Sequence, residues 1–148
     1  HRTEGVAVAV TGEGLEARFL LRRRPEEGLL GGMWEFPGSR SDGESPDETA
    51  RRTLREALAA PLPTGDGVGR ALPAVEHAFS HLKVTYRPFL YRLKATEAFT
   101  PREQARAAPG PGAGGPARWA SRGELGALPL PVAQRRILRL AEERLGEG

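Results

Sequence analysis

A four-residue segment that begins at Ser45 restricts the local fold more than any other part of the sequence. Ser45 is a preferred N-cap residue, Pro46 suits the first helical position, and Glu48 stands where its side chain closes a capping box. The apolar residues of the next turns recur at helical spacing, at Ala50, Leu54, Ala57 and Leu58. We therefore predict a helix that starts here and ends before the prolines at positions 61 and 63.

Runs of strand-like residues lie on both sides of this helix. Before it, residues 5–10 and 15–21 predict a β-hairpin, and residues 33–38 predict a short strand that follows a glycine-rich loop. After it, the predicted strands are residues 71–79, 84–93 and 118–120. Pro88 has no backbone N–H to donate, so the strand that contains it is expected at a sheet edge or at a bulge.

The end of the chain predicts a loop and two helical features. Ala, Gly and Pro make up almost all of residues 107–117, and this composition predicts a flexible surface loop. Ser121 and Glu124 form a second capping-box pattern, and residues 131–145 predict a final amphipathic helix. Helices separated by runs of strands are typical of an α+β fold with a mixed sheet, so we expect one such domain over residues 1–148.

Composition limits the class of protein further. The chain is 39% hydrophobic and 28% charged, and its mean hydropathy of −0.45 and short apolar runs argue against a membrane protein. The absence of cysteine excludes disulfides, thiolate metal sites and a cysteine nucleophile within these residues. The net charge is +3, and because Lys83 and Lys94 are the only lysines, 20 of the 22 basic residues are arginines. Arginine binds phosphates in a bidentate manner, which favours a nucleic-acid or nucleotide partner, although GC-rich codon usage explains the same bias.

A longer pattern extends from the loop before the predicted helix into the helix itself. Gly38 is followed after five residues by Glu44 and after seven more by Arg52, with Glu56 four positions further on. This spacing resembles the Nudix box, G-x5-E-x7-R-E-U-x-E-E-x-G-U, in which U is aliphatic. The resemblance implies a loop and helix whose carboxylates would hold magnesium or manganese against a nucleoside diphosphate.

Several positions of that box carry a different residue here. The replaced positions are Thr53, Ala57 and Ala59. Carboxylates three and four residues apart would converge on one helix face, but two of the three are missing. Glu44 and Glu56 are better explained as a cap or as ion-pair partners of Arg52 or Arg55 than as metal ligands. We therefore expect no catalytic residue and no metal site in this chain.

Two further motifs narrow the resemblance. Residues 28–38 read GLLGGMWEFPG and resemble the G-L-L-x-G-L/M-W-E-F-P-G segment in the C-terminal domain of adenine DNA glycosylases, the MutY family. Residues 77–81 read HAFSH and resemble the H-x-F-S/T-H loop of that domain. Trp119 with the LPLP segment at 128–131 is also similar, but this ending occurs in Nudix relatives generally.

The MutY resemblance implies a Nudix-like α/β/α sandwich, a mixed β-sheet flanked by helices, that recognises 8-oxoguanine opposite adenine in base excision repair. In the family an N-terminal helical domain with a 4Fe-4S cluster removes the adenine, so that catalytic domain and its cluster are expected outside this chain, which brings no cofactor. The expected partners are double-stranded DNA containing 8-oxoguanine and the N-terminal domain, with no membrane. The protein is expected to be a monomer in the bacterial cytoplasm, associated with the nucleoid.

By the same resemblance, Phe79, Ser80 and His81 match the loop that approaches 8-oxoguanine. A serine hydroxyl both donates and accepts hydrogen bonds, which suits a lesion whose oxidised edge has a new donor nitrogen and a new carbonyl. Phe79 would wedge against neighbouring bases, and His81 would bind phosphate or stabilise the loop. Plainer interpretations remain: Phe79 as the last core residue of its strand, and Ser80 as an ordinary turn residue.

Other candidate residues also have two interpretations. His77 and His81 lie on a predicted strand and loop without a third ligand, which disfavours a metal pair. Trp34 and Phe36 are expected in the core or against the box helix rather than on bases. Five arginines would either follow the DNA phosphates or form ordinary solvated surface: Arg22, Arg23, Arg24, Arg87 and Arg92.

Two other functions stay open on the sequence alone. A stand-alone Nudix hydrolase would act on oxidised or ordinary nucleoside triphosphates with magnesium or manganese. Thr53 and Ala57 argue against it, and Ser80 within its histidine-flanked loop argues for DNA recognition. A catalytically inactive Nudix scaffold that binds another protein is the third hypothesis.

Overall fold

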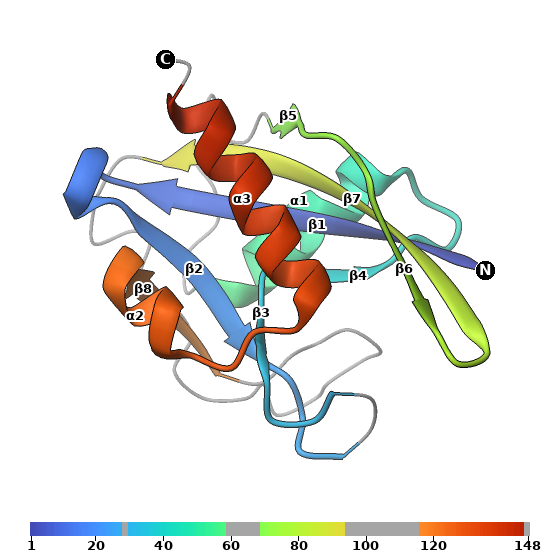
Figure 1. Cartoon of the computed structure of the whole chain (residues 1–148). Coiled ribbons are helices and arrows are strands. Elements are labelled where there is room, and N and C mark those ends of the chain that lie inside the picture. Colours follow the sequence, from blue (N-terminus) through green and yellow to red (C-terminus); the bar gives the residue numbers. More distant parts are fainter. Residues whose placement is uncertain (28–29, 59–68, 94–115, 147–148) are drawn as a thin grey trace.

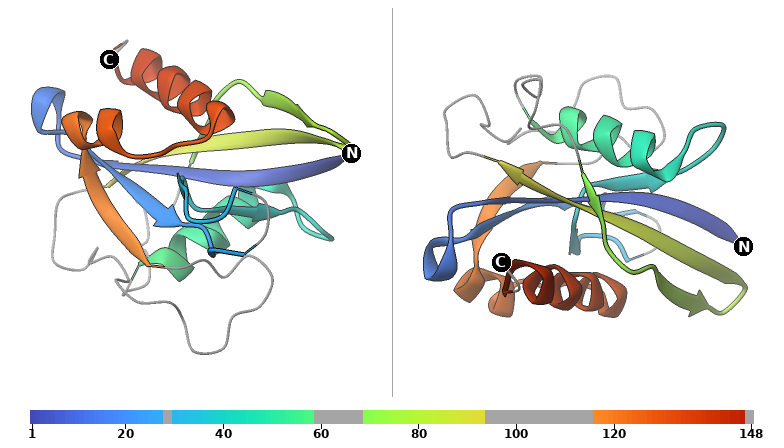
Figure 2. Two further views of the ribbon diagram at one scale, coloured as in Figure 1. Left: turned by 60° about the horizontal axis from the view of Figure 1, so that its bottom comes forward. Right: turned by 90° about the horizontal axis from the view of Figure 1, so that it is seen from above.

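The computed structural model describes residues 1–27, 30–58, 69–93 and 116–146 as a β-sheet between two helical layers (Figure 1). The strands are β1 (Arg2–Thr11), β2 (Arg18–Arg23), β3 (Trp34–Glu35), β4 (Gly38–Arg40), β5 (Arg70–Ala71), β6 (Val75–Phe79), β7 (Leu82–Leu93) and β8 (Ala117–Ser121). The helices are the 3-10 turn η1 (Gly14–Glu16), α1 (Pro46–Ala57), α2 (Arg122–Ala127) and α3 (Val132–Gly146). Figure 2 shows α1 on one side of the sheet and α2 with α3 on the other. The predicted α/β/α arrangement is confirmed.

The sheet is mixed, as predicted. Its main path runs β3-β2-β1-β7-β5, with β4 paired to β1, β6 to β7 and β8 to β2. Strands β1 and β7 pair in parallel along ten positions, and the other pairs are antiparallel. The predicted hairpin is confirmed, since Val10 lies opposite Phe19, but its second strand begins at Arg18 and not at residue 15, because Gly14–Glu16 form the 3-10 turn η1.

Both predicted capping boxes are present. The backbone N–H of Glu48 donates to the Ser45 hydroxyl oxygen at 3.2 Å, and the Ser45 N–H donates to the Glu48 carboxylate at 3.2 Å. Ser121 and Glu124 make the same reciprocal pair at the start of α2. Each box satisfies two N–H groups that a helix start leaves open, which explains why these helices begin where the sequence predicts. The prolines at 61 and 63 lie outside the described residues, as do residues 107–115 of the predicted loop.

Of the two settings predicted for Pro88, the sheet edge is wrong, because β7 is paired on both sides. The irregularity takes the other form, since residues 72–74 of the neighbour face only residues 87 and 88, one extra residue as in a bulge. Pro88 lies opposite Val6 of β1, and its carbonyl accepts a hydrogen bond of 2.9 Å from the N–H of Leu72. On the side of β7 away from β1, the neighbouring segment is interrupted at residues 72–74, between β5 and β6. The sequence predicted a single strand over residues 71–79 there. The N and C=O of one strand residue point to the same side, so the missing N–H of Pro88 faces this break.

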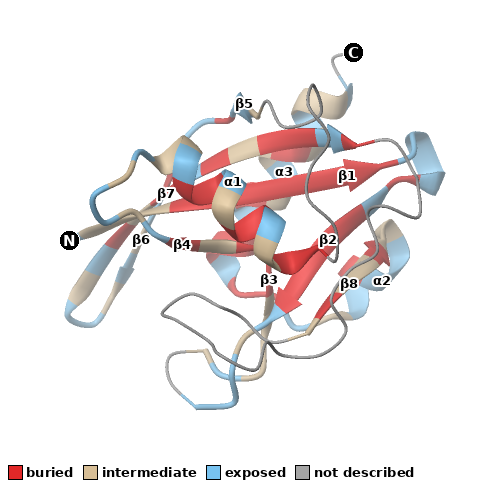
Figure 3. Cartoon of the chain, turned by 180° about the vertical axis from the view of Figure 1, so that it is seen from behind, coloured by how far each residue is buried: buried red, intermediate tan, exposed pale blue. Residues whose placement is uncertain are grey.

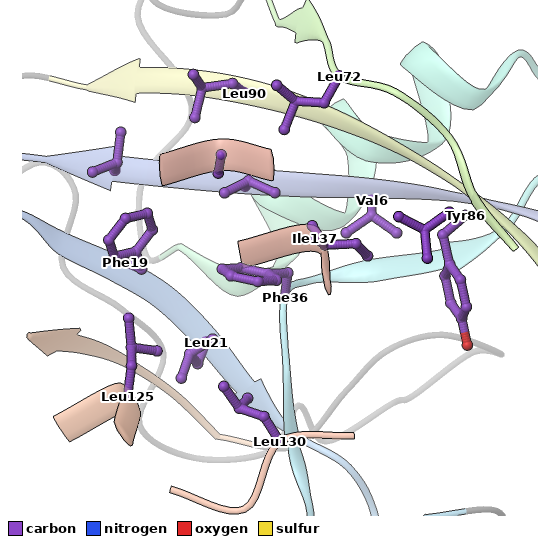
Figure 4. Close-up of a cluster of buried hydrophobic side chains, with 14 of the residues drawn as sticks. Val6, Phe19, Leu21, Phe36, Leu72, Tyr86, Leu90, Leu125, Leu130 and Ile137 are labelled. Carbon is purple, nitrogen blue, oxygen red and sulfur yellow. The ribbon is translucent and has the colours of Figure 1, made fainter. Parts of the chain in front are cut away.

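Alternating residues of β1 divide the core between the two helical layers. Val6, Val8 and Val10 face α3 and pack with Ile137 in the larger cluster (Figure 4). The intervening residues, Ala7 and Ala9, face α1 and pack with Ala50, Leu54 and Tyr91. Figure 3 shows that the buried residues run along the central strands β1, β2 and β7. No helix among the described residues is long and apolar enough to cross a membrane.

Gly5 is expected to be a position where even one methyl group destabilises the fold. A Cβ there would lie 2.3 Å from the Pro46 carbonyl oxygen and 2.8 Å from the Thr49 Cβ, because α1 packs directly on β1. We expect Gly5→Ala to lower the free energy of unfolding by about 1–3 kcal/mol, measured by urea denaturation.

Gly126 in α2 is the matched control, since no atom lies within 4 Å of a Cβ built there. Gly126→Ala is expected to raise the free energy of unfolding by about 0.4–1 kcal/mol through a less flexible unfolded chain. Equal stability of Gly5→Ala and the unmodified chain would contradict the close approach of α1 to β1.

Candidate nucleic-acid interface

The β6–β7 hairpin presents Ser80 and His81 as its turn. Phe79 lies opposite Leu82, so these two residues are the whole connection between the strands. Both are exposed. Within the described part of the chain, the Ser80 hydroxyl has no hydrogen-bond partner. The hairpin therefore offers a hydroxyl and an imidazole to an external ligand.

Phe79 lies at the base of this turn and not at its tip. Its ring is half-buried, packs against the larger core cluster and makes an edge contact with the His77 ring at 4.6 Å between centroids. It also lines a cavity of about 240 Å³ between the hairpin and the start of α3. The geometry thus fits the core interpretation of Phe79, with one side of the ring turned to this cavity.

The cavity is lined by aromatic and aliphatic side chains. His77, Phe79 and Tyr86 come from the hairpin, and Met33 and Val132 are among the others. Burial, followed by the charge of nearby carboxylates, raises the pKa of Tyr86 to about 12. Tyr86 therefore keeps its proton at neutral pH and remains a hydrogen-bond donor.

Arg52 lies between the two glutamates that the Nudix frame singled out. Its Nε and Nη2 donate to the Glu44 Oε1 at 3.0 and 2.7 Å, and its Nη1 lies 3.5 Å from the Glu56 Oε1. The Thr49 hydroxyl donates to the same Glu44 oxygen at 3.0 Å. The hydrogen bond from Arg52 holds the pKa of Glu44 below its usual range. One guanidinium thus pairs closely with Glu44 and lies beside Glu56 without a hydrogen bond to its buried Oε1.

The replaced positions of the box carry no free oxygen ligand. Thr53 is fully buried, and its hydroxyl donates to the Ala50 carbonyl at 3.0 Å. Ala57 is buried and has no polar side-chain atom, and Ala59 lies outside the described residues. The described residues hold no group of three or more His, Cys, Asp or Glu side chains arranged for a metal ion. This donor set does not fit the divalent ion that the box would hold.

Gly38, the first residue of the box, has a structural role. Its carbonyl accepts a 2.5 Å hydrogen bond from the Arg22 Nη2, and it lies opposite Val6 of β1. A Cβ at this position would lie 2.9 Å from the Gly5 carbonyl oxygen. Gly38 therefore lets β4 approach β1 closely.

Glu35 is a buried acid whose role the sequence patterns did not reveal. Its two carboxylate oxygens accept hydrogen bonds from Arg22 at 3.1 Å and from Arg24 at 2.7 Å. The side chains of Arg22 and Glu35 are only 5% and 9% exposed. The one sequence feature that pointed to this role was a glutamate between two aromatic residues, in a chain with three consecutive arginines at positions 22–24.

Trp34 and Phe36 belong to the core on the α3 face, so of the two settings expected for them the core is confirmed and the box helix is wrong. Phe36 is buried and makes an edge contact with Phe19 at 6.4 Å between centroids. Trp34 is half-buried in the same cluster, with the Arg118 guanidinium 5.9 Å above its ring. The alternation of strand residues decides this, because these side chains emerge on the face opposite α1.

The five arginines that would either follow the DNA phosphates or form ordinary solvated surface do not share one surface. Arg22 and Arg24 pair with Glu35, and Arg23 pairs with Glu26 at 2.6 Å. Arg87 and Arg92 lie five positions apart on β7, and residues an odd number apart in a strand point to opposite faces. The positions of these arginines in the sequence do not show which face of the sheet each side chain occupies.

A protein-family model described as a NUDIX domain matches residues 6–140. The chain belongs to the NUDIX domain family. This NUDIX domain is 36% identical over 129 residues to the human adenine DNA glycosylase, a match that covers 85% of this chain and 21% of the human protein. It is 35% identical to the rat adenine DNA glycosylase, covering 84% of this chain and 22% of that protein. The chain thus spans about a fifth of the length of these relatives.

Solved structures show the same fold for this NUDIX domain. The C-terminal domain of mouse MUTYH, solved in a complex with human PCNA, matches with a TM-score of 0.74 and 24% identity, over 97% of this chain and 89% of that one. The NUDIX domain of Shewanella oneidensis NrtR, solved with ADP ribose, matches with a TM-score of 0.76 and 20% identity, over 98% and 88%. The predicted Nudix-like fold and the predicted resemblance to adenine DNA glycosylases are both confirmed.

Proposed function

We propose that this NUDIX domain recognises 8-oxoguanine in double-stranded DNA as the C-terminal domain of an A/G-specific adenine DNA glycosylase in base excision repair. The observation that carries the proposal is the Ser80 hydroxyl, exposed at a hairpin turn and without a partner among the described residues. The similarity to adenine DNA glycosylases over 85% of the chain supports it.

The chemistry of the turn suits the lesion. Guanine presents only acceptors, N7 and O6, on its major-groove edge, whereas 8-oxoguanine has a donor at N7 and a carbonyl at C8. One hydroxyl serves both groups, because it donates one hydrogen bond and accepts others. His81 beside it supplies a ring N–H for a phosphate oxygen, and Phe79 supports the turn from below.

The proposal places adenine removal outside this chain. The N-terminal glycosylase domain, with its 4Fe-4S cluster, would supply the catalytic residues, and it would be the protein partner of this domain. The chain has no cysteine to hold such a cluster. The proposed setting is a monomeric bacterial protein in the cytoplasm, associated with the nucleoid.

Nucleotide hydrolysis is the second candidate function, and the Gly38, Glu44, Arg52 and Glu56 frame is the observation that favours it. The hydrogen-bonded pair of Arg52 with Glu44 and the replaced box positions Thr53 and Ala57 argue against it. Manganese-dependent hydrolysis of 8-oxo-dGTP by the purified chain would establish this function in place of DNA recognition.

Ser80→Ala is the variant that tests the proposed function. The unmodified chain is expected to bind a duplex with 8-oxoguanine opposite adenine more tightly than one with guanine opposite adenine. Loss of the hydroxyl is expected to reduce that preference by about tenfold, because two hydrogen bonds to the lesion disappear. Both affinities are measured by fluorescence anisotropy at one salt concentration.

Ser80→Thr is the matched control, since it keeps a hydroxyl at the same position and should keep most of the preference. Binding to the undamaged duplex should be the same in all three proteins, because it depends on phosphate contacts. An undiminished lesion preference in Ser80→Ala would remove Ser80 from the site.

A further inference from the structure

Three arginines gather on the exposed face of α3. Arg135, Arg136 and Arg139 are all exposed, and their separations of three and four residues bring them together on one side of the helix. The first ten residues of α3 contain no aspartate or glutamate. The opposite side of the helix, which includes Ile137, is buried in the core.

Two of these arginines are held in place by neutral groups. Arg135 donates to the carbonyl of Leu128 at 2.8 Å, and Arg136 donates to the carbonyl of Glu76 at 2.9 Å. A carbonyl orients a guanidinium without cancelling its charge. Arg139 has neither an ion pair nor a hydrogen bond within the described part of the chain.

The acids around this face do not neutralise it. The Glu76 carboxylate lies 3.7 Å from the Lys83 ammonium, and Glu142 pairs with Arg122 at 3.0 Å. Glu143 is the exposed acid of the next turn. Like charges three and four residues apart repel weakly, and a cation in the first turn of a helix, as at Arg135, opposes the helix dipole. An anion bound to the cluster would relieve both effects.

The arginine cluster and the Ser80 turn lie on neighbouring elements. Arg136 bonds to β6, the strand that leads into the turn, and the cavity beneath Phe79 is closed on its other side by the start of α3. Figures 1 and 2 show the N-terminal end of α3 beside the β6–β7 hairpin in each view. A ligand that reaches across the turn therefore meets the arginines as well.

We infer that Arg135, Arg136 and Arg139 bind the phosphate backbone of the DNA strand that passes the Ser80 turn. The inference rests on the proposed function and adds a second contact surface to it. The helix rises about 6 Å from Arg135 to Arg139, while phosphates of one strand follow each other every 3.4 Å along the DNA axis. The three guanidiniums thus match about two successive phosphates, to which arginine binds in a bidentate manner.

The test compares two triple variants with the same loss of charge. In one, Arg135, Arg136 and Arg139 become glutamine. In the other, the three changed residues are Arg51, Arg55 and Arg87, which are also exposed but lie on α1 or on the α1 face of β7. Affinity for an undamaged duplex is measured between 50 and 200 mM salt.

Each lost phosphate contact is expected to reduce the slope of log K against log salt by about 0.9. The α3 variant should therefore lose about 2 from this slope, and the α1-face variant should keep it. Arg139→Gln alone should lose about 0.9 and breaks no hydrogen bond or ion pair within the described chain, so it serves if the triple variant fails to fold. Equal slopes in the two triple variants, or an unchanged slope in Arg139→Gln, would overturn the inference.

Lesion preference separates this inference from the proposed function. Phosphate contacts carry no base information, so the α3 variant should keep the ratio of affinities for 8-oxoguanine and guanine duplexes. An unmodified chain without lesion preference would refute the proposed function, while a selective slope change would still support the arginine surface. Lesion preference with equal slopes would overturn the surface alone.

Discussion

Glu35→Gln is expected to lower the free energy of unfolding by about 3–5 kcal/mol. The substitution keeps the shape of the side chain but removes the carboxylate charge that pairs with the Arg22 guanidinium, whose side chain is only 5% exposed. Arg24 loses the same partner at 2.7 Å. A charge buried without its counterion is strongly destabilising, whatever the net value of the intact pair. Guanidinium chloride denaturation followed by circular dichroism measures the effect.

The exposed pair of Arg23 and Glu26 is the matched control. It has a shorter N–O distance of 2.6 Å, yet its side chains are 45% and 74% exposed. Glu26→Gln should therefore change the free energy of unfolding by no more than about 1 kcal/mol. Similar decreases in the free energy of unfolding for Glu26→Gln and Glu35→Gln would contradict the idea that burial makes the Glu35 ion pair important for stability.

Phe36→Ala is expected to lower the free energy of unfolding by about 3–5 kcal/mol. Phe36 is 1% exposed, contacts Phe19 edge to face and lies at the centre of the cluster that joins β1, β2 and α3 (Figure 4). Removing the ring leaves a cavity that close-packed neighbours fill only in part. The same denaturation measurement applies.

Leu15 provides the comparison for this core position, because it is 93% exposed on the turn between β1 and β2. Leu15→Ala should leave the unfolding midpoint nearly unchanged. A loss below about 1.5 kcal/mol in Phe36→Ala would contradict the packing of this ring at the centre of the cluster.

These two expected effects assign a structural role to residues 34–38, the WEFPG segment. Glu35 organises the neighbouring arginines, Phe36 fills the core, and Gly38 allows β4 to approach β1. The segment that most clearly marks the family resemblance therefore supports the fold. The residues proposed to contact the lesion occupy a two-residue turn elsewhere.

The parts of the fold that were predictable depend on neighbours in the sequence. A capping box involves residues three positions apart, so Ser45 with Glu48 and Ser121 with Glu124 marked both helix starts correctly. The β1–β2 hairpin followed from two apolar runs around a glycine turn. These features require no knowledge of distant segments.

Features that depend on distant segments were missed. The parallel pairing of β1 with β7 joins residues about eighty positions apart, and it is what places Pro88 inside the sheet instead of at its edge. The break between β5 and β6 lies opposite this proline on the other side of β7. The preference of proline for edge strands is judged from one strand alone, and it takes no account of which distant strands pair with it.

The sequence by itself determined where two helices start, the mixed α+β class, the family resemblance and the loss of two box carboxylates at Thr53 and Ala57. Only the tertiary structure decided that Arg52 pairs with Glu44 and lies beside Glu56, and that Arg87 and Arg92 lie on opposite faces. It also decided that the arginines sharing a surface beside the Ser80 turn come from α3. The physical reason is range: capping and periodicity act over a few residues, whereas charge compensation and shared surfaces depend on which segments the sheet brings together.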